Sequence, residues 1–275
     1  MGDQLKGKVA VVTGASRGVG QAIAEALAAR GTRVALVARS RDQLHAVEEN
    51  IRSAGGEARA IAADASQGEA VLSMQREVET QLGQAAILVN AAGIFGPISL
   101  IKDSDPARWI ETLAINTIAP YLTCRAFAGG MIESGWGRII NVTSAAALHP
   151  PGPLNSAYAT SKVALNQFTR HLAAELVGTG VTANVFHPGD VKTDMWATIR
   201  DEAEQMGAAG EAYRKWVAWV EETGGDPPYK AADLVLRLTE DAAASVNGQF
   251  LWIEDPLQAP ISSWEDTANA QPWNQ

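Results

Sequence analysis

The sequence has almost no cysteine and no long apolar run. Its one cysteine among 275 residues, Cys124, excludes an intrachain disulfide and a cysteine-clustered metal site. No stretch approaches the roughly 20 consecutive apolar residues of a membrane-spanning helix. The polar start, Met1–Lys8, leads directly into a predicted strand and lacks the features of a signal peptide. These absences predict a cytoplasmic protein that does not enter a membrane.

Basic residues are also scarce. Lys and Arg number 22 against 31 Asp and Glu, which leaves a formal net charge of −9. Nucleic-acid binding needs clustered Lys and Arg, so we expect no nucleic-acid partner. The four histidines, His45, His149, His171 and His187, have no metal-ligand spacing, and no metal site is predicted. Apolar residues make up 47% of the chain, enough to bury a sizeable core.

Short β-rich runs alternate with helical stretches along the chain. The strands are expected at Lys8–Thr13, Arg33–Ala38, Ala58–Ala62, Ala86–Asn90, Gly137–Val142, Val181–Phe186 and Gln249–Ile253. The helices between them are expected at Gln21–Arg30, Arg41–Ala54, Gly68–Leu82, Pro106–Glu133 and Ser156–Val177, and Ser66 and Glu69 have the spacing of a capping box for the third. Alternation of this kind predicts a parallel sheet of about seven strands with helices on both faces. We therefore predict an α/β fold, a single doubly wound Rossmann-like domain over residues 1–253, with a C-terminal tail at 254–275.

A glycine-rich loop joins the first strand to the first helix. It is the run TGASRGVG (13–20), with Gly14, Gly18 and Gly20. Glycines in such a turn let the backbone approach a pyrophosphate, and the following helix N-terminus favours an anion. Three residues separate the first two glycines, a wider spacing than the usual dinucleotide fingerprint, and an ordinary β–α turn is the alternative.

Arg39 follows the second strand, where an NAD-specific protein of this architecture places an acid for the ribose hydroxyls. An arginine there suits a 2′-phosphate, and Arg17 in the glycine-rich loop is within reach of the same group. Neither Val37 nor Ala38 is acidic, so we predict NADP(H) in preference to NAD(H). The alternative is that Arg39 and Arg41 only solvate the start of a helix.

Tyr158 and Lys162 stand four residues apart in a predicted helix and therefore share a face. A tyrosine ordinarily titrates near ~10, too high for ready proton exchange at neutral pH. A lysine cation beside the phenol lowers that pKa, so the pair predicts acid–base catalysis. The spacing of Tyr158 and Lys162 alone is a weak indication of catalysis, but combined with the upstream glycine-rich loop it is a strong one.

The chain resembles the short-chain dehydrogenase/reductase family from Leu5 to about Ile253. The resemblance rests on TGASRGVG (13–20), NAAG (90–93), Asn116, NVTS (141–144), YATSK (158–162) and PGDVKTDM (188–195), all in the family's order. It implies direct hydride transfer between a nicotinamide and a ketone or secondary alcohol, without a metal.

The resemblance also implies a role for each matching residue. Tyr158 is expected to be the general acid or base, and Lys162 to lower its pKa and hold the nicotinamide ribose. Ser144 is expected to bind the substrate oxygen, and Asn116 to anchor a water in a proton relay. The implied cofactor contacts are Gly14, Ser16, Arg17, Gly18, Val19, Gly20, Arg39, Asp64, Asn90, Ala91, Gly93, Tyr158, Lys162, Pro188, Gly189, Val191 and Thr193. For Asp64 the alternative is that it only helps the nearby helix to begin.

Residues 189–229 follow the sixth strand and are expected to form the lid segment that covers the substrate in this family. Trp196 is expected to line an apolar pocket for a bulky substrate, and His149 to face it unless it is an ordinary loop histidine. A stripe at i, i+3, i+4 and i+7 either packs the lid segment onto the body or joins that pocket. Its members are Tyr213, Trp216, Val217 and Val220.

We predict an NADPH-dependent carbonyl reductase acting on a small molecule, with an NAD-linked alcohol dehydrogenase working oxidatively as the alternative. A non-catalytic nucleotide-binding scaffold is disfavoured because Ser144, Tyr158 and Lys162 are all present. A carrier-protein-linked 3-oxoacyl reductase would need a basic docking patch that the sequence does not show. The resemblance further implies a homo-oligomer, dimer or tetramer, formed by pairing the two long helices predicted at 106–133 and 156–177.

Overall fold

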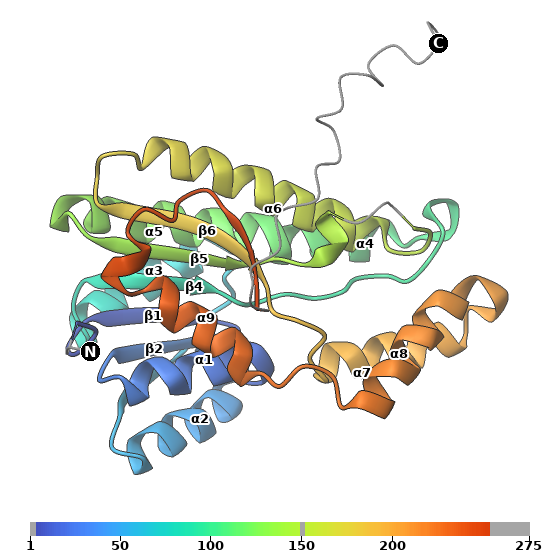
Figure 1. Ribbon diagram of the computed structural model, residues 1–275, viewed down its shortest axis with the longest axis horizontal. Coiled ribbons are helices and arrows are strands. Elements are labelled where there is room, and N and C mark those ends of the chain that lie inside the picture. Colours follow the sequence, from blue (N-terminus) through green and yellow to red (C-terminus); the bar gives the residue numbers. More distant parts are fainter. Residues whose placement is uncertain (1–3, 149–151, 254–275) are drawn as a thin grey trace, which may run out of the picture.

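The computed structural model describes residues 4–148 and 152–253. One sheet runs through it, with seven parallel strands in the order β3-β2-β1-β4-β5-β6-β7 (Figure 1). The strands are β1 (Val9–Thr13), β2 (Arg33–Ala38), β3 (Glu57–Ala62), β4 (Ala85–Asn90), β5 (Gly137–Val142), β6 (Val181–His187) and β7 (Phe250–Trp252). The predicted doubly wound α/β fold is confirmed, and the strand ends differ from the predicted ones by about one residue.

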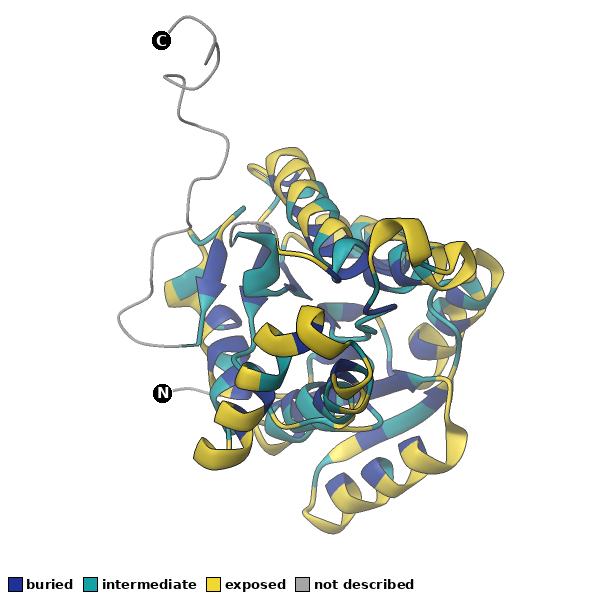
Figure 2. Ribbon diagram, turned by 90° about the vertical axis from the view of Figure 1, so that its right-hand side faces the viewer, coloured by how far each residue is buried: buried dark blue, intermediate teal, exposed yellow. Residues whose placement is uncertain are grey.

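Strands β1 to β6 each contribute to two apolar cores because successive residues face opposite sides of a sheet. In β1, Ala10 and Val12 pack into one core, and Val9 and Val11 into the other. Helices α1 (Gly18–Ala29), α2 (Arg41–Ser53) and α9 (Tyr229–Leu238) cover the first face; α3 (Gly68–Gln81), α5 (Ala119–Ser134) and α6 (Ser156–Glu175) cover the second (Figure 1). Their outer sides are exposed (Figure 2). Burial on both faces explains the nearly continuous apolar strands in the sequence.

The helical stretch predicted at 106–133 is confirmed, but it is not one regular α-helix. The structure has α4 (Pro106–Leu113), a π-helical turn at Ala114–Ile118, and then α5. Pro120 has no N–H to donate to the carbonyl of Asn116 four residues earlier, so regular α-helical bonding cannot continue through this point. The π turn accommodates the break and leaves Asn116 completely buried.

Two helix starts also differ from the prediction. Helix α1 begins at Gly18 rather than Gln21, inside the glycine-rich loop. The predicted capping box is wrong, because α3 begins after Gln67 and no side chain caps it. The backbone N–H and hydroxyl of Ser66 both donate to Oδ1 of Asp64, at 3.0 and 2.7 Å, so Asp64 organises this turn instead.

A buried polar chain crosses the middle of the sheet. Asn90 of β4 and Asn141 of β5 are register partners, and the Nδ2 of Asn90 donates to the Oδ1 of Asn141 at 2.8 Å. The hydroxyl of Thr123 on α5 donates to Asn90, and Asn141 donates to Thr169 on α6, each at 2.8 Å. These bonds tie two helices of one face to the central strands.

The lid segment lies beyond the carboxyl ends of the strands (Figure 1). It contains α7 (Asp194–Glu204) and α8 (Glu211–Thr223), placed between β6 and α9. These helices share a third apolar cluster with the body, whose fully buried members are Ile98, Leu154, Trp196, Ile199, Val217 and Val220. Among the described residues, no helix has the length and apolar character to span a membrane.

Candidate active site

A cavity of about 950 Å³ opens where the strands end, beneath the lid segment. Its position is the crevice that a doubly wound sheet offers at the carboxyl ends of its strands, and its size suits a small-molecule site. Tyr158, Lys162 and Ser144 all line it. So do the predicted cofactor contacts Gly14, Ser16, Arg17, Gly18, Val19, Gly20, Arg39, Asp64, Ala91, Gly93, Pro188, Gly189, Val191 and Thr193.

The glycine-rich loop fits the pyrophosphate of a dinucleotide. Helix α1 begins behind Arg17, whose side chain makes no capping hydrogen bond to the first turn. The first-turn N–H groups of a helix lack intrahelical acceptors and attract an anion. A methyl group on Gly14 would lie 2.7 Å from the nitrogen of Ala92, and one on Gly20 would lie 2.3 Å from the carbonyl of Gly14. Only glycine therefore allows this close fold of the loop.

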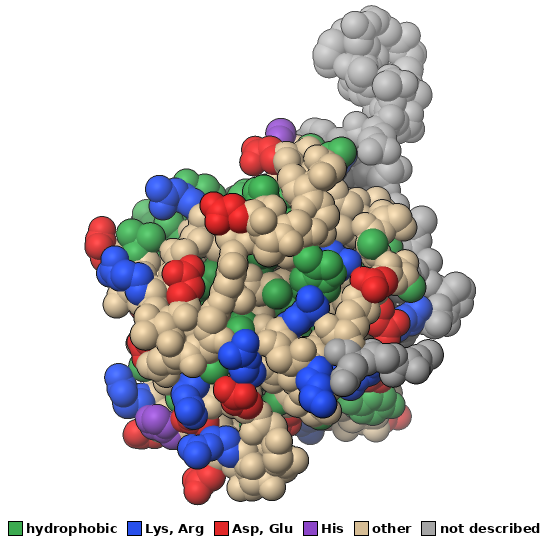
Figure 3. All heavy atoms as spheres, turned by 90° about the vertical axis from the view of Figure 1, so that its left-hand side faces the viewer, with side chains coloured by type: hydrophobic (Ala, Val, Ile, Leu, Met, Phe, Trp, Pro, Cys, Tyr) green, Lys and Arg blue, Asp and Glu red, His purple; other side chains and the backbone are tan. Residues whose placement is uncertain are grey.

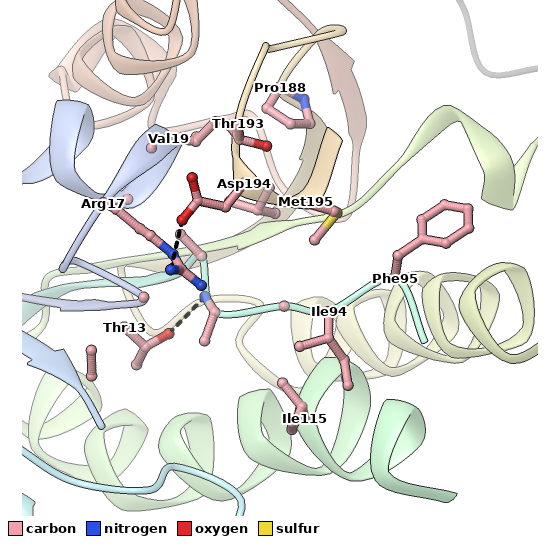
Figure 4. Close-up of a pocket in the computed structure, with 18 of the residues that line it drawn as sticks. Thr13, Arg17, Val19, Ile94, Phe95, Ile115, Pro188, Thr193, Asp194 and Met195 are labelled. Atoms are coloured by element: carbon pink, nitrogen blue, oxygen red, sulfur yellow. Dashed lines mark hydrogen bonds and ion pairs between the residues drawn. The ribbon is translucent and has the colours of Figure 1, made fainter. Parts of the chain in front are cut away.

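Two arginines lie on the cofactor side of the cavity. Arg39 follows β2, is exposed and lines the cavity, as the sequence predicted. Arg17 reaches from the glycine-rich loop to the first residue of α7, where its Nη1 lies 2.6 Å from Oδ2 of Asp194 (Figure 4). Both partners of this ion pair are mostly exposed. Asp194 thus occupies one end of the Arg17 guanidinium.

Helix α6 presents Tyr158 and Lys162 to the same cavity, as their spacing predicted. The two residues are only 8% and 4% exposed. The Nζ of Lys162 donates to the carbonyl of Val142 at 2.9 Å and lies 5.7 Å from the centre of the Tyr158 ring. Ser144, at the end of β5, hydrogen-bonds to the phenol. A serine and a tyrosine hydroxyl therefore meet at one point of the cavity wall.

Burial controls the protonation of this pair. Burial raises the pKa of Tyr158 above its ordinary value, Asp190 also raises it, and the hydrogen bond from Ser144 opposes them. Burial lowers the pKa of the Lys162 amine to about 8. The expected lowering of the Tyr158 pKa by Lys162 is not seen. The reason is that both groups have lost their water, which disfavours the charged form of each.

Asn116 does not line the cavity. Its Oδ1 accepts from the N–H of Ile94 at 2.9 Å, and its Nδ2 donates to the carbonyl of Ile94 at 2.9 Å and the hydroxyl of Ser161 at 3.0 Å. The side chain thereby joins the segment after β4 to helix α6. A water anchored by Asn116 remains a prediction.

Three further predicted residues have different outcomes. Asn90 lies outside the cavity lining, because its amide is used in the polar chain of the sheet. Asp64 lines the cavity and also forms the turn with Ser66, so both of its predicted roles are compatible with its position. His149 falls outside the described residues.

Aromatic side chains gather around Tyr158. The ring of Phe95 stacks on Tyr158, with centroids 4.6 Å apart and planes 29° from parallel, and meets Tyr213 edge-on at 5.9 Å. Trp196 and Trp216 also line the cavity. Sequence reasoning missed Phe95, although its place just after NAAG (90–93), at the carboxyl end of β4, was the available signal.

The predicted stripe of α8 is divided between the contact with the body and the cavity wall. Val217 and Val220 are buried in the cluster that holds the lid segment to the body, whereas Trp216 lines the cavity. Trp196 is 4% exposed and belongs to the same cluster. In the part of the chain that the structure describes, no three His, Cys, Asp or Glu side chains are grouped to hold a metal.

Comparison with known proteins agrees with the predicted family resemblance. The sequence profile described as short chain dehydrogenase matches residues 8–204. A short chain dehydrogenase of Pseudocercospora fijiensis is 40% identical over 196 residues, which cover 70% of this chain and 63% of that relative. The 3-oxoacyl-[acyl-carrier-protein] reductase FabG of Pseudomonas aeruginosa is 35% identical over 245 residues, 89% of this chain and 94% of the relative.

Solved structures share the whole architecture. An NAD+-bound xylitol dehydrogenase superposes with a TM-score of 0.83 at 27% identity, covering 90% of this chain and 98% of that one. A variant of actinorhodin polyketide ketoreductase with NADPH superposes with a TM-score of 0.82 at 30% identity, covering 92% and 97%. The two differ in the nicotinamide cofactor that they hold.

Proposed function

Because the chain belongs to the short-chain dehydrogenase family, we propose that it reduces a small ketone with NADPH. The family membership makes it an NAD(P)-dependent oxidoreductase of carbonyl and alcohol groups. One observation carries the proposal. Ser144, Tyr158 and Lys162 line the same cavity as the glycine-rich loop, so a dinucleotide seated on the loop reaches them.

The bound dihydronicotinamide supplies the hydride. Ser144 and Tyr158 both line the cavity, where their hydroxyls would bind the carbonyl oxygen of the substrate. The raised pKa of Tyr158 keeps its proton in place at neutral pH until the oxygen takes it. Lys162 would hold the ribose hydroxyls of the bound cofactor. In the oxidative direction Tyr158 accepts the proton.

The preference for NADPH rests on Arg39. It stands at the end of β2 on the cavity wall, and the residues just before it, Val37 and Ala38, carry no acid for the 2′-hydroxyl of NAD. An arginine matches the geometry and charge of a 2′-phosphate. The solved relatives do not choose between the cofactors, because one holds NAD+ and another NADPH.

The test is a binding titration of the purified protein with NADPH and NADH, followed by turnover across a panel of bulky ketones. Arg39→Asp should weaken NADPH binding at least tenfold and leave NADH binding nearly unchanged. Arg41→Asp is the matched control, since Arg41 is exposed and lies outside the cavity lining. Unchanged NADPH affinity in Arg39→Asp would show that this account of cofactor choice is wrong.

An NAD-linked dehydrogenase acting oxidatively is the second candidate. The observation in its favour is the ion pair between Arg17 and Asp194, which occupies one of the two arginines expected at the 2′-phosphate. Tighter binding of NADH than of NADPH in the same titration, with oxidation of an alcohol, would support this candidate.

We further propose that a second copy of the chain covers the outer face of helices α4 to α6. Large apolar side chains are exposed there, among them Ile110, Ile118, Tyr121 and Val163. Light scattering should give the mass of a dimer or a tetramer; a monomer would contradict the proposal. On the face at the amino ends of the strands, acidic and basic side chains are interspersed (Figure 3). The absence of a nucleic-acid partner remains a prediction. A cytoplasmic location also remains a prediction.

A further inference from the structure

The lid segment leaves and rejoins the body through a narrow neck. Gly189 and Asp190 form its outgoing side, and Gly225 and Asp226 its returning side. The backbone N–H of Asp226 donates to the carbonyl of Asp190 at 3.0 Å, and the N–H of Asp190 donates to Oδ2 of Asp226 at 3.0 Å. Two reciprocal hydrogen bonds thus close the lid neck.

The two sides of the lid neck lie in direct contact. A methyl group on Gly225 would lie 2.3 Å from the carbonyl oxygen of Asp190, and one on Gly189 would lie 2.6 Å from Oδ2 of Asp226. Both glycines also have positive φ angles, of 67° and 83°. Only glycine allows this approach, so the Asp226 carboxylate reaches the opposite backbone with nothing between them.

The second oxygen of the same carboxylate binds the body of the protein. Oδ1 of Asp226 lies 2.8 Å from Nζ of Lys230 in the first turn of α9, and α9 packs against α1, the helix of the glycine-rich loop. Burial alone would raise the pKa of Asp226, but the bonds from Lys230 and from the Asp190 N–H have the larger combined effect. The pKa is therefore below its ordinary value, and the carboxylate is ionised at neutral pH. The Asp226 side chain therefore joins the outgoing side of the lid neck to the helix layer that carries the glycine-rich loop.

The residues just beyond Asp190 face the cofactor side of the cavity. Val191 and Thr193 both line it, and a methyl group on Gly18 would lie 3.3 Å from Cγ2 of Thr193. The start of the lid segment thus lies against the glycine-rich loop. The position of residues 191–193 depends on the lid neck, because the hydrogen bonds between Asp190 and Asp226 fix the residue just before them.

We propose that Asp226 is a positioning residue, which holds Val191 and Thr193 against the nicotinamide half of the cofactor through the Asp190 N–H. This inference rests on the proposed function. Without the carboxylate, the bond from the Asp190 N–H and the contact with Lys230 are lost and only the main-chain bond from the Asp226 N–H to the Asp190 carbonyl remains, so the start of the lid segment is held less firmly to α9. The adenosine half of the cofactor, bound near Arg39 and Asp64 at the other end of the cavity, is not affected.

The experiment compares two ligands on three variants. Asp226→Ala should raise the Kd of NADPH about tenfold, the effect of losing a hydrogen bond to a charged group, and change the Kd of adenosine 2′,5′-bisphosphate less than about twofold. Asp226→Asn should recover most of the affinity, since its amide oxygen still accepts from the Asp190 N–H. Asp233→Ala removes the same charge from an exposed site on α9 and should behave as wild type.

Hydrogen–deuterium exchange on the cofactor-free protein gives an independent readout. Amides 189–193 should exchange faster in Asp226→Ala than in wild type, and Asp233→Ala should not differ. Equal losses for NADPH and the bisphosphate, or unchanged exchange at 189–193, would overturn the positioning role. A wild-type protein that binds neither NADPH nor NADH would overturn the proposed function itself. If the wild type binds NADPH and Asp226→Ala binds it equally well, only the positioning role of Asp226 is overturned.

Discussion

Replacing Lys162 by methionine should make the protein more stable while removing its activity. The side chain is almost completely buried, and burial lowers its pKa from the ordinary 10.5 to about 8. The difference of about 2.5 corresponds to about 3 kcal/mol at roughly 1.4 kcal/mol for each pKa unit. At pH 7 the folded protein therefore carries about 3 kcal/mol of unfavourable free energy to keep this ammonium charged without water.

The substitution also removes a favourable contact. Nζ of Lys162 donates to the carbonyl of Val142 at 2.9 Å, and methionine cannot replace that bond. Losing a buried hydrogen bond of this kind costs about 1–2 kcal/mol. Methionine keeps an apolar chain of similar length in place of the lysine stem. The net gain in the free energy of unfolding at pH 7 is thus about 1–2 kcal/mol.

The gain should disappear at high pH. The pKa of Lys162 is lower in the folded than in the unfolded protein, so between about pH 8 and 10.5 the unfolded chain binds more protons at this site. Stability of the wild type therefore rises with pH across that window, and the methionine variant lacks this rise. At pH 10, close to the pKa of the unfolded chain, most of the charge penalty is gone, so the lost bond to Val142 outweighs what remains and the variant should be slightly the less stable protein.

Urea unfolding of the cofactor-free proteins at pH 7 and pH 10 measures both effects, and NADPH oxidation measures the activity. Lys215→Met is the control, because Lys215 is exposed on α8 and its loss should change the free energy of unfolding by less than about 0.5 kcal/mol at either pH. The reasoning is refuted if Lys162→Met is less stable than wild type at pH 7, or if its advantage is the same at both pH values.

Two further predictions concern the phenol. Tyr158→Phe should lower turnover by about 10²–10⁴ while leaving the Kd of NADPH nearly unchanged, as measured by steady-state kinetics and by titration; near-normal turnover would remove Tyr158 from the acid role. Phe95→Ala admits water to the Tyr158 ring, and because burial is the main cause of the raised pKa, that pKa should fall. Reduction needs the protonated phenol, so kcat/KM should decline with rising pH from a lower pH than in wild type. Phe95→Leu, which keeps the ring covered, should retain the wild-type profile, and an identical profile for Phe95→Ala would contradict the role of burial.

The sheet and the cofactor loop could be predicted because local patterns determine them. A strand buried on both faces must be apolar throughout, as in Val9–Thr13, and a loop that touches a helix start must be glycine-rich. The break in the helix after α4 had a local signal too, since Pro120 interrupts the predicted run. The helical periodicity of residues 106–133 predicts a regular helix and does not reveal the π turn, which accommodates the N–H that Pro120 lacks.

Parts of the site depend on packing that no local pattern records. The spacing of Tyr158 and Lys162 places both on one face, but their pKa values depend on how much water Phe95 and the surrounding walls exclude. Nothing in the run around Asp226 indicates that its carboxylate meets the backbone of Asp190, thirty-six residues earlier. Contacts of this kind require the three-dimensional return of the chain through the lid neck.

The amide pair of Asn90 and Asn141 bears on how the sheet avoids misassembly. The strands around it, with Leu88 and Val89 beside Ile139 and Ile140, are apolar and would pack almost equally well if β4 and β5 paired two residues out of step. A slipped pairing would separate the two amides and bury each beside apolar neighbours, at a cost of several kcal/mol. The pair therefore discriminates against a misaligned sheet near the strand ends, where the glycine-rich loop and Ser144 line the same cavity. Replacing both amides by apolar residues would leave a core of ordinary packing that no longer distinguishes the correct alignment from its neighbours.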